Sequence, residues 1–249
     1  MKKLFLFLLL SAILTSCQIT EDVTFHKNGS GSYNFNVDMS GMMQMMKGMG
    51  KKNDSLKTQK KLEKKDTIIY FSSIIEKNKD SIAKLSKEER ESLLALKDAQ
   101  IRINLDEEKG KMLMQYVIPF KSIADLDHMT EKLKHLNSFN KKNKQGMGNM
   151  DDMMPKAEIT YRFNKHKFHR IVKVLKSVDQ KKTDKDQNKL DEMMKMFRYK
   201  LVYHFPYKIA STTYKEALIG ADGQSIHIEV PIDSLMKNPK LLDFEVKFQ

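Results

Sequence analysis

The sequence predicts an α+β fold in which antiparallel β-hairpins alternate with amphipathic helices. Apolar and polar residues alternate along pairs of segments that turn residues separate, which is typical of hairpins. Between these pairs, apolar residues recur at helical spacing behind helix-start signals. Strand patterns dominate the N- and C-terminal ends. This order favours an antiparallel sheet and argues against a doubly wound parallel one.

Three hairpins are expected. Asn28-Gly29 supplies a turn signal in the first, and Asp106 to Gly110 forms the turn of the second. Pro119 should end the pairing of the second hairpin, because proline lacks a backbone donor. The paired segments are 23–25 with 33–37, 101–105 with 112–118, and 159–163 with 168–174. Further strands are expected at 199–205, 217–220, 225–230 and 244–248.

Helices are expected between the hairpins. Ser86 and Glu89 have the spacing of a capping box, and Ser122 begins a second helical pattern. The expected helical segments are 39–50, 86–96, 122–136, 190–197 and 234–236. Residues 67–75 fit either a helix or a strand, because their apolar spacing is helical but their β-branched and aromatic content suits a sheet.

The N-terminus has the three parts of a secretory signal. Lys2 and Lys3 precede an apolar run at 4–13, which is about half the length that a membrane-spanning helix needs. The following Leu-Thr-Ser-Cys tetrapeptide resembles the lipobox that lipoprotein signal peptidase recognises. That resemblance implies cleavage between Ser16 and Cys17 and a covalent lipid on Cys17, which is the chain's one cysteine. No other cofactor is indicated.

The expected organisation follows from this cleavage. Residues 1–16 are a signal that is removed, 17–22 a lipidated tether, and 23–249 one α+β domain. Exposed charged segments are expected near 50–66, 140–156 and 177–188. Removal of the signal leaves 233 residues, enough for a substantial core, and a net charge of +11 in place of +13. With its cysteine lipidated, the chain can form no disulfide.

The positive charge raises the question of anionic partners. An exported, membrane-bound protein rarely meets nucleic acid, and no nucleic-acid recognition motif is present. Lipid headgroups, anionic envelope surfaces and acidic envelope proteins are the nearer partners. A solvated lysine-rich surface with no specific partner is the simpler explanation of the charge.

Methionine is the compositional outlier, with 18 residues. Four methionines recur at positions i, i+3, i+4 and i+7 and therefore share one face of a helix: Met39, Met42, Met43 and Met46. This face would suit core packing or an adaptable contact with an envelope protein. A Cu(I) site is the alternative, because thioethers are soft ligands; its candidate ligands are Met42, Met43, Met45, Met46 and Met49.

Signals for catalysis are weak. The sequence contains neither a G-x-S-x-G elbow nor a phosphate-binding glycine motif. His166 and His169 are three residues apart at a strand turn, where such residues normally point to opposite faces. His128 and His135 share a helical face but are about 10 Å apart. A zinc site and an enzyme are therefore both disfavoured.

Several short segments resemble lipoproteins of Bacteroidetes-type bacteria. They are Cys17, 23–25, the Gly-Ser-Gly-Ser-Tyr at 29–33, the Asp-Met-Ser at 38–40, Phe205-Pro206, the Asp222-Gly223 turn and the last strand. The strand-rich ends also resemble LppM-like lipoprotein domains. The resemblance implies an envelope location and transfers no functional residue besides Cys17.

Residues after the cysteine bear on location and function. By the retention rule of Gram-negative lipoproteins, Gln18 in place of aspartate favours the outer membrane. Glu21 and Asp22 resemble an acidic surface-export patch, which leaves open whether the protein faces the periplasm or the exterior. The leading hypothesis is a non-enzymatic, outer-membrane-anchored binding or accessory module that contacts another envelope component.

Overall fold

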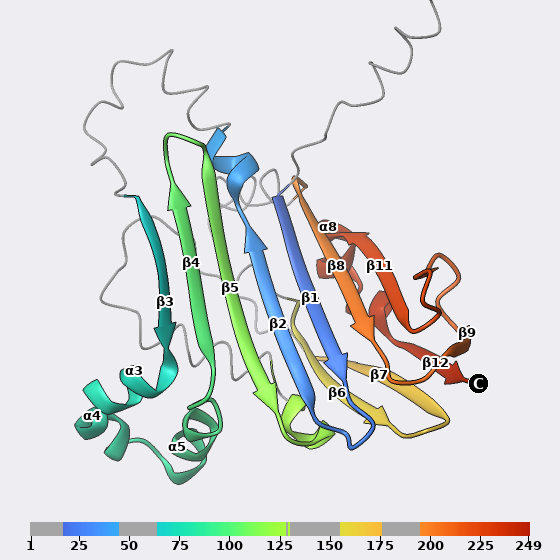
Figure 1. Ribbon diagram of the computed structural model, residues 1–249, viewed down its shortest axis with the longest axis horizontal. Coiled ribbons are helices and arrows are strands. Elements are labelled where there is room, and N and C mark those ends of the chain that lie inside the picture. Colours follow the sequence, from blue (N-terminus) through green and yellow to red (C-terminus); the bar gives the residue numbers. More distant parts are fainter. Residues whose placement is uncertain (1–16, 45–63, 128, 130–154, 176–194) are drawn as a thin grey trace, which may run out of the picture.

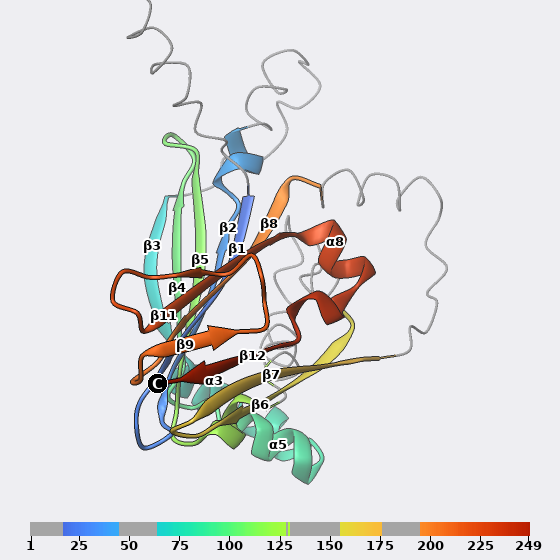
Figure 2. The same cartoon turned by 90° about the vertical axis from the view of Figure 1, so that its right-hand side faces the viewer.

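Two β-sheets form the body of the protein. The structure, a computed structural model, describes residues 17–44, 64–127, 129, 155–175 and 195–249 (Figure 1). The larger sheet has eight strands in the order β10-β11-β8-β1-β2-β5-β4-β3, and the smaller has four in the order β6-β7-β12-β9. Viewed from the side, the smaller sheet covers one face of the larger (Figure 2). The α+β class is confirmed, with strands dominating.

The strands are β1 (Cys17–Phe25), β2 (Gly31–Asp38), β3 (Lys65–Tyr70), β4 (Gln100–Asp106), β5 (Lys111–Phe120), β6 (Ala157–Phe163), β7 (Lys167–Val174), β8 (Phe197–His204), β9 (Ile209–Thr212), β10 (Leu218–Ile219), β11 (Ser225–Pro231) and β12 (Phe244–Phe248). The α-helices are α3 (Phe71–Lys77), α4 (Lys79–Ala83), α5 (Lys87–Leu94) and α8 (Ile232–Lys237), and the 3-10 helices are η2 (Ile123–Leu126) and η5 (Pro239–Leu242).

All three expected hairpins are present, as β1-β2, β4-β5 and β6-β7. The first strand, however, begins at Cys17 rather than Val23, so residues 17–22 are part of the sheet. Its odd-numbered residues are buried and its even-numbered residues half-buried. Glu21 occupies one of the buried positions, and this charged residue conceals the alternation in the sequence.

One strand pairing in the large sheet is parallel and was not expected from the sequence. β1 pairs with β8 in parallel, from Cys17 opposite Phe197 to Thr24 opposite His204. This pairing joins the N-terminal hairpin to the C-terminal strands. β1 therefore lies inside the large sheet, with a hydrogen-bonded neighbour on each side.

The second hairpin extends further than the sequence predicted. Pro119 does not end the pairing, because it lies opposite Ser32 and β5 continues to Phe120. β4 pairs with β5 only as far as Val117, so the side of β5 that faces β4 has no strand partner at Pro119. Proline is tolerated at such an edge because its missing N–H leaves no hydrogen bond of the sheet unmade. The ambiguous segment 67–75 forms both structures: β3 ends at Tyr70 and α3 starts at Phe71.

The helix predictions had mixed outcomes. The Ser86–Glu89 capping box begins α5 as expected, and α8 confirms the short helix near 234–236. Ser122 also precedes a helix, but it is the 3-10 helix η2, which ends at Leu126. Phe197 begins β8 instead of ending a helix. Residues 40–44 are helical, whereas 45–49, 130–136, 190–194 and most of the three charged segments lie outside the described residues.

Aromatic side chains fill the space between the sheets. The Phe25 ring lies 5.2 Å from Phe168 and 5.4 Å from Phe205, centroid to centroid. It also contacts Phe120 at 6.0 Å and Phe163 at 5.2 Å. Because these rings come from both sheets, the first hairpin is held to the smaller sheet through Phe25.

Gly31 allows the first hairpin to close against β5. A Cβ atom at this position would lie 1.9 Å from the Thr24 carbonyl oxygen and 2.4 Å from Phe120 Cζ. Gly31→Ala is therefore expected to lower the free energy of unfolding by about 1–3 kcal/mol, because the backbone oxygen cannot yield as a flexible side chain would. Ser32→Ala, at the next position, should cost less than about 0.5 kcal/mol. Urea unfolding of both variants measures the difference, and equal midpoints would contradict the steric argument.

Candidate functional site

A buried carboxylate with four hydrogen-bond donors lies between the sheets. Glu21 on β1 is 1% exposed. Its Oε1 accepts hydrogen bonds from the hydroxyls of Tyr161 (2.9 Å) and Tyr203. Its Oε2 accepts from the Tyr199 hydroxyl at 2.8 Å and lies 3.5 Å from Arg170 Nη2. We call these five residues the Glu21 cluster.

Arg170 completes the cluster from β7. Its Nε donates to the Tyr203 hydroxyl at 3.0 Å, and its Nη1 donates to the Leu242 carbonyl at 2.9 Å. Tyr203 thus accepts from the arginine and donates to the carboxylate. Arg170 is 2% exposed, and a charge removed from water to this extent is tolerated only when it is paired and hydrogen-bonded.

Burial dominates the proton affinities in the cluster. It raises the pKa of the Tyr161, Tyr199 and Tyr203 hydroxyls well above their usual range, and the Glu21 charge adds to the effect. The pKa of Tyr33, buried on β2, is raised by the same two causes. The tyrosines are therefore neutral donors at neutral pH.

The cluster connects the two sheets and leaves no carboxylate oxygen for a ligand. Three of its residues belong to the large sheet and two, Tyr161 and Arg170, to the small one. We therefore assign it a structural role. Glu21 also cannot form an exposed acidic patch with Asp22 in the folded protein.

Cys17, the expected lipid attachment point, is the first residue of β1 and is 1% exposed. Burial raises the pKa of its thiol, and a hydrogen bond from the Met42 backbone partly offsets this rise. The helical residues 40–44 therefore lie against the sulfur. Ser16, the other residue of the expected cleavage site, lies outside the described residues.

The described methionines of the expected helical face point mainly inward. Met39 and Met43 are 5% and 6% exposed and Met39 belongs to the hydrophobic core, whereas Met42 packs against that core half-buried. Of the proposed face, only Met42 is accessible among the described residues. Met45, Met46 and Met49 lie outside them, so the copper hypothesis stays a prediction from the sequence.

The histidine pair is not brought together. His169 Nε2 lies 3.2 Å from Asp243 Oδ1, and its Nδ1 lies 3.7 Å from Glu245 Oε2, whereas His166 is in the β6-β7 turn. His128 and His135 lie outside the described residues. In the part of the chain that the structure describes, no three His, Cys, Asp or Glu side chains are placed to hold a metal ion.

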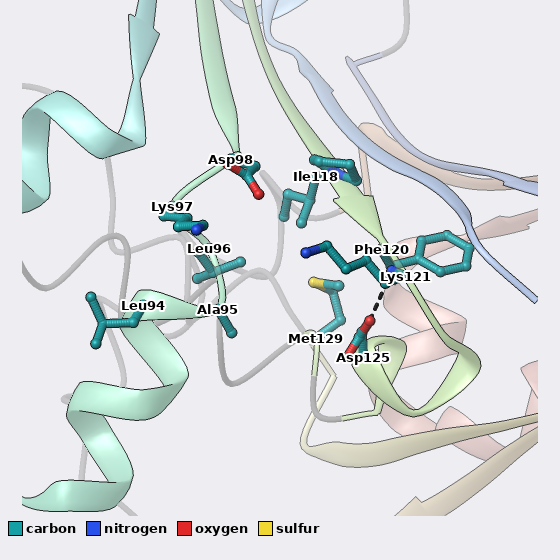
Figure 3. A pocket seen from close by; sticks show the side chains of 11 residues that line it. Leu94, Ala95, Leu96, Lys97, Asp98, Ile118, Phe120, Lys121, Asp125 and Met129 are labelled. Atoms are coloured by element: carbon teal, nitrogen blue, oxygen red, sulfur yellow. Dashed lines mark hydrogen bonds between the residues drawn. The ribbon is translucent and has the colours of Figure 1, made fainter.

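A small pocket lies between the end of α5 and β5 (Figure 3). Leu96, Ile118 and Met129 form its apolar side. The Asp125 carboxylate accepts hydrogen bonds from the backbone amides of Lys121 (2.8 Å) and Ser122 (2.9 Å), so it serves the η2 turn. The volume of about 190 Å³ is below that of typical ligand sites. We find no catalytic arrangement in this pocket.

A larger hollow lies on the outer face of the large sheet, the face opposite the smaller sheet. Its volume is about 470 Å³, within the range of ligand sites. Two rows of side chains cross five neighbouring strands in register and line it. The rows are Gln18-Asp38-Leu113-Asn104-Asp66 and Thr20-Asn36-Gln115-Arg102-Ile68. We call this feature the outer hollow.

The lining of the outer hollow mixes hydrogen-bonding and apolar side chains. It presents carboxamides from four strands, the hydroxyl of Thr20, the cations of Arg102 and Lys111 and the carboxylates of Asp38 and Asp66, beside apolar side chains that include Ile68, Leu113 and Met114. Arg102 is exposed and forms no ion pair with any other described residue. Carboxamides and guanidinium groups donate several hydrogen bonds in fixed directions, which suits hydroxyl, carbonyl or phosphate groups.

Sequence reasoning missed both the outer hollow and the Glu21 cluster. The outward residues of β1 and β2 look like an ordinary solvated strand face, and only the register of five strands brings them together. The alternation Phe35-Asn36-Val37 was a usable signal for which residues face outward, but it did not identify their neighbours. The sequence contains no local signal that pairs Glu21 with Arg170, 149 positions away.

Comparisons with known proteins add little. Neither a protein-family model nor a curated protein matches the chain. One solved structure is similar, the NMR structure of the folded domain of the LppM protein of Mycobacterium tuberculosis, with a TM-score of 0.39 and 8% identity. The alignment covers 94% of this chain and 90% of that chain. Among the described residues, no helix is both long and apolar enough to span a membrane.

Proposed function

We propose that this protein is a lipid-anchored, non-enzymatic envelope module that contacts a polar envelope component through the outer hollow. The lipobox resemblance at Cys17 supports the anchor, and Gln18 favours the outer membrane. The observation that carries the proposal is the position of the outer hollow, because Gln18, the residue after Cys17, lines it. A component bound there would lie close to the lipid headgroups.

The buried thiol constrains the order of events in this proposal. Acyl transfer requires an accessible sulfur, whereas the folded chain covers Cys17 with residues 40–44. Lipidation would therefore precede the pairing of β1 with β2 and β8, and in the lipidated protein residues 40–44 must move aside from the sulfur to give the diacylglyceryl group a way out. This order fits a chain that is exported unfolded and modified as it emerges from the membrane.

The anchor is tested by palmitate labelling and membrane fractionation of the full chain in a Gram-negative host. We expect the natural sequence to incorporate palmitate and to sediment with the outer membrane. Cys17→Ser should lose both properties, because serine cannot form the thioether. Membrane sedimentation of Cys17→Ser equal to that of the natural sequence would refute the anchor.

The contact surface is tested by photo-crosslinking in intact cells. A photoreactive residue at Gln115, in the middle of the outer hollow, should form an adduct with an envelope component. The same residue at Arg162, exposed on β6 in the other sheet, provides the matched control. Arg102→Ala should weaken the Gln115 adduct, since it removes the guanidinium group that lies on β4, opposite Gln115. Equal adducts from positions 115 and 162 would exclude the hollow as the contact.

A further inference from the structure

The point of lipid attachment is built into the large sheet without a spacer. Cys17 is the first residue of β1, where it lies opposite Phe197 of β8, and the next residue, Gln18, pairs with Asp38 of β2. A flexible spacer would let the body move away from the membrane by about 5–6 Å times the square root of its length in residues. Here the spacer length is zero, so the lipid would hold one edge of the sheet.

Other segments end at the same edge. β2 ends at Asp38, and the chain passes through Met39, whose amide donates to the Met112 carbonyl at 2.9 Å, into the helical residues 40–44. The β4-β5 turn at 107–110 lies beyond Asp106 and Lys111. Figure 1 shows the start of β1, the 40–44 helix and this turn together at the top of the sheet. We call residues 39–44, 107–110 and 195–197 the anchor edge.

The chemistry of the anchor edge is compatible with a headgroup layer. Lys109 and Lys195 are exposed there, the exposed Glu108 and the half-buried Glu107 belong to the same turn as Lys109, and the half-buried Met42 adds an apolar surface beside Cys17. Asp106 is buried, and its carboxylate accepts the Lys109 amide at 3.1 Å and lies 3.4 Å from Lys64 Nζ. Lysines near an anionic membrane surface contribute about 1 kcal/mol each, but the two glutamates offset Lys109 and Lys195, so the covalent lipid and not charge would hold this edge to the membrane.

From this placement we infer that the lipidated protein stands with its anchor edge directly on the bilayer surface and its large sheet upright. The inference rests on the proposed lipidation of Cys17. The nine residues of β1 then hold the β1-β2 turn roughly 30 Å above the membrane, at about 3.3 Å per residue. The outer hollow, which starts at Gln18, opens beside the headgroups, whereas the turn at 26–30 faces away from them.

A depth measurement tests the orientation. Because the one native cysteine carries the lipid, a single introduced cysteine can be labelled uniquely. Lys109→Cys is in the anchor edge, and Lys27→Cys, with the same change of charge, is in the exposed β1-β2 turn. Each acylated, full-length variant is labelled with a fluorophore and reconstituted into phosphatidylethanolamine–phosphatidylglycerol vesicles that contain a headgroup spin-labelled lipid.

We expect the label at position 109 to be quenched several-fold more strongly than the label at position 27. A spacer of about ten glycine and serine residues between Cys17 and Gln18, with a reach of roughly 17 Å, should abolish most of this contrast. Equal quenching at both positions in the acylated protein would overturn the orientation alone. A chain that incorporates no palmitate would refute the lipid anchor itself, and the orientation would fall with it.

Discussion

Replacing Arg170 with methionine is expected to lower the free energy of unfolding by about 3–5 kcal/mol, the usual cost of leaving one member of a buried ion pair alone. Glu21 would keep its three tyrosine donors but lose the compensating positive charge. The Leu242 carbonyl would also lose its 2.9 Å hydrogen bond. Since a small domain is stable by only about 5–15 kcal/mol, this single change should remove a large part of the total.

Two controls separate the loss of the pair from a general effect of losing arginine. Arg198→Met removes the Nε–Oε1 contact of 2.9 Å with Glu229, but both side chains are about two-fifths exposed. This exposed pair should contribute only about 0–1 kcal/mol. The double change Glu21→Gln with Arg170→Met should recover part of the loss, because it removes both buried charges. Urea unfolding of these three variants and of Glu21→Gln alone gives the four values needed.

If Arg170→Met were as stable as Arg198→Met, the buried ion pair between Glu21 and Arg170 would not stabilise the fold more than an exposed pair does. Full additivity of the Glu21 and Arg170 changes would likewise contradict coupling between them, since residues in one hydrogen-bonded network normally show interaction energies of about 0.5–3 kcal/mol.

The local parts of the fold were predictable, whereas its long-range parts were not. Alternation and turn residues located three hairpins, and the Ser86–Glu89 spacing located the start of α5. Local sequence contains no information on which strands meet across a long separation, so the parallel pairing of β1 with β8 was missed. The sequence also could not show that the strands divide into two sheets.

Glu21 illustrates why the candidate site was harder to predict than the fold. A glutamate in the middle of a strand normally marks the solvent face, so the expected strand started after it. The structure instead buries Glu21 because tyrosines at three inward positions and an arginine on the other sheet satisfy it. The residues of the outer hollow were missed for the opposite reason, since polar residues on a strand need no special explanation.

The Glu21 cluster, together with the buried Tyr33, also predicts a sharp loss of stability in alkali. The hydroxyls of Tyr33, Tyr161, Tyr199 and Tyr203 have pKa values raised by burial and then by the Glu21 charge, whereas in the unfolded chain a tyrosine has its ordinary pKa of about 10. Each therefore binds its proton more tightly when folded. The stabilisation that comes from this tighter proton binding is fully present below pH 10. It declines as the pH rises from 10 toward the pKa values that the tyrosines have in the folded protein.

The expected slope is steep. Each tyrosine that is protonated only in the folded state lowers the free energy of unfolding by up to about 1.4 kcal/mol per pH unit above 10, so four together approach about 5 kcal/mol per unit. A stability of about 5–15 kcal/mol would then be exhausted within roughly one to three pH units. We expect tyrosinate absorbance at 295 nm to rise cooperatively, at the same pH at which the β-sheet circular dichroism is lost.

Tyr199→Phe is the informative variant for this titration. It removes one of the four buried hydroxyls. The free energy of unfolding should therefore fall less steeply above pH 10, by about 1.4 kcal/mol per pH unit, which is the share of one tyrosine. At neutral pH the same variant should be less stable, because Glu21 Oε2 loses its 2.8 Å hydrogen bond. Tyrosine ionisation that runs to completion while the circular dichroism stays unchanged would mean that these hydroxyls are open to solvent, contrary to the structure.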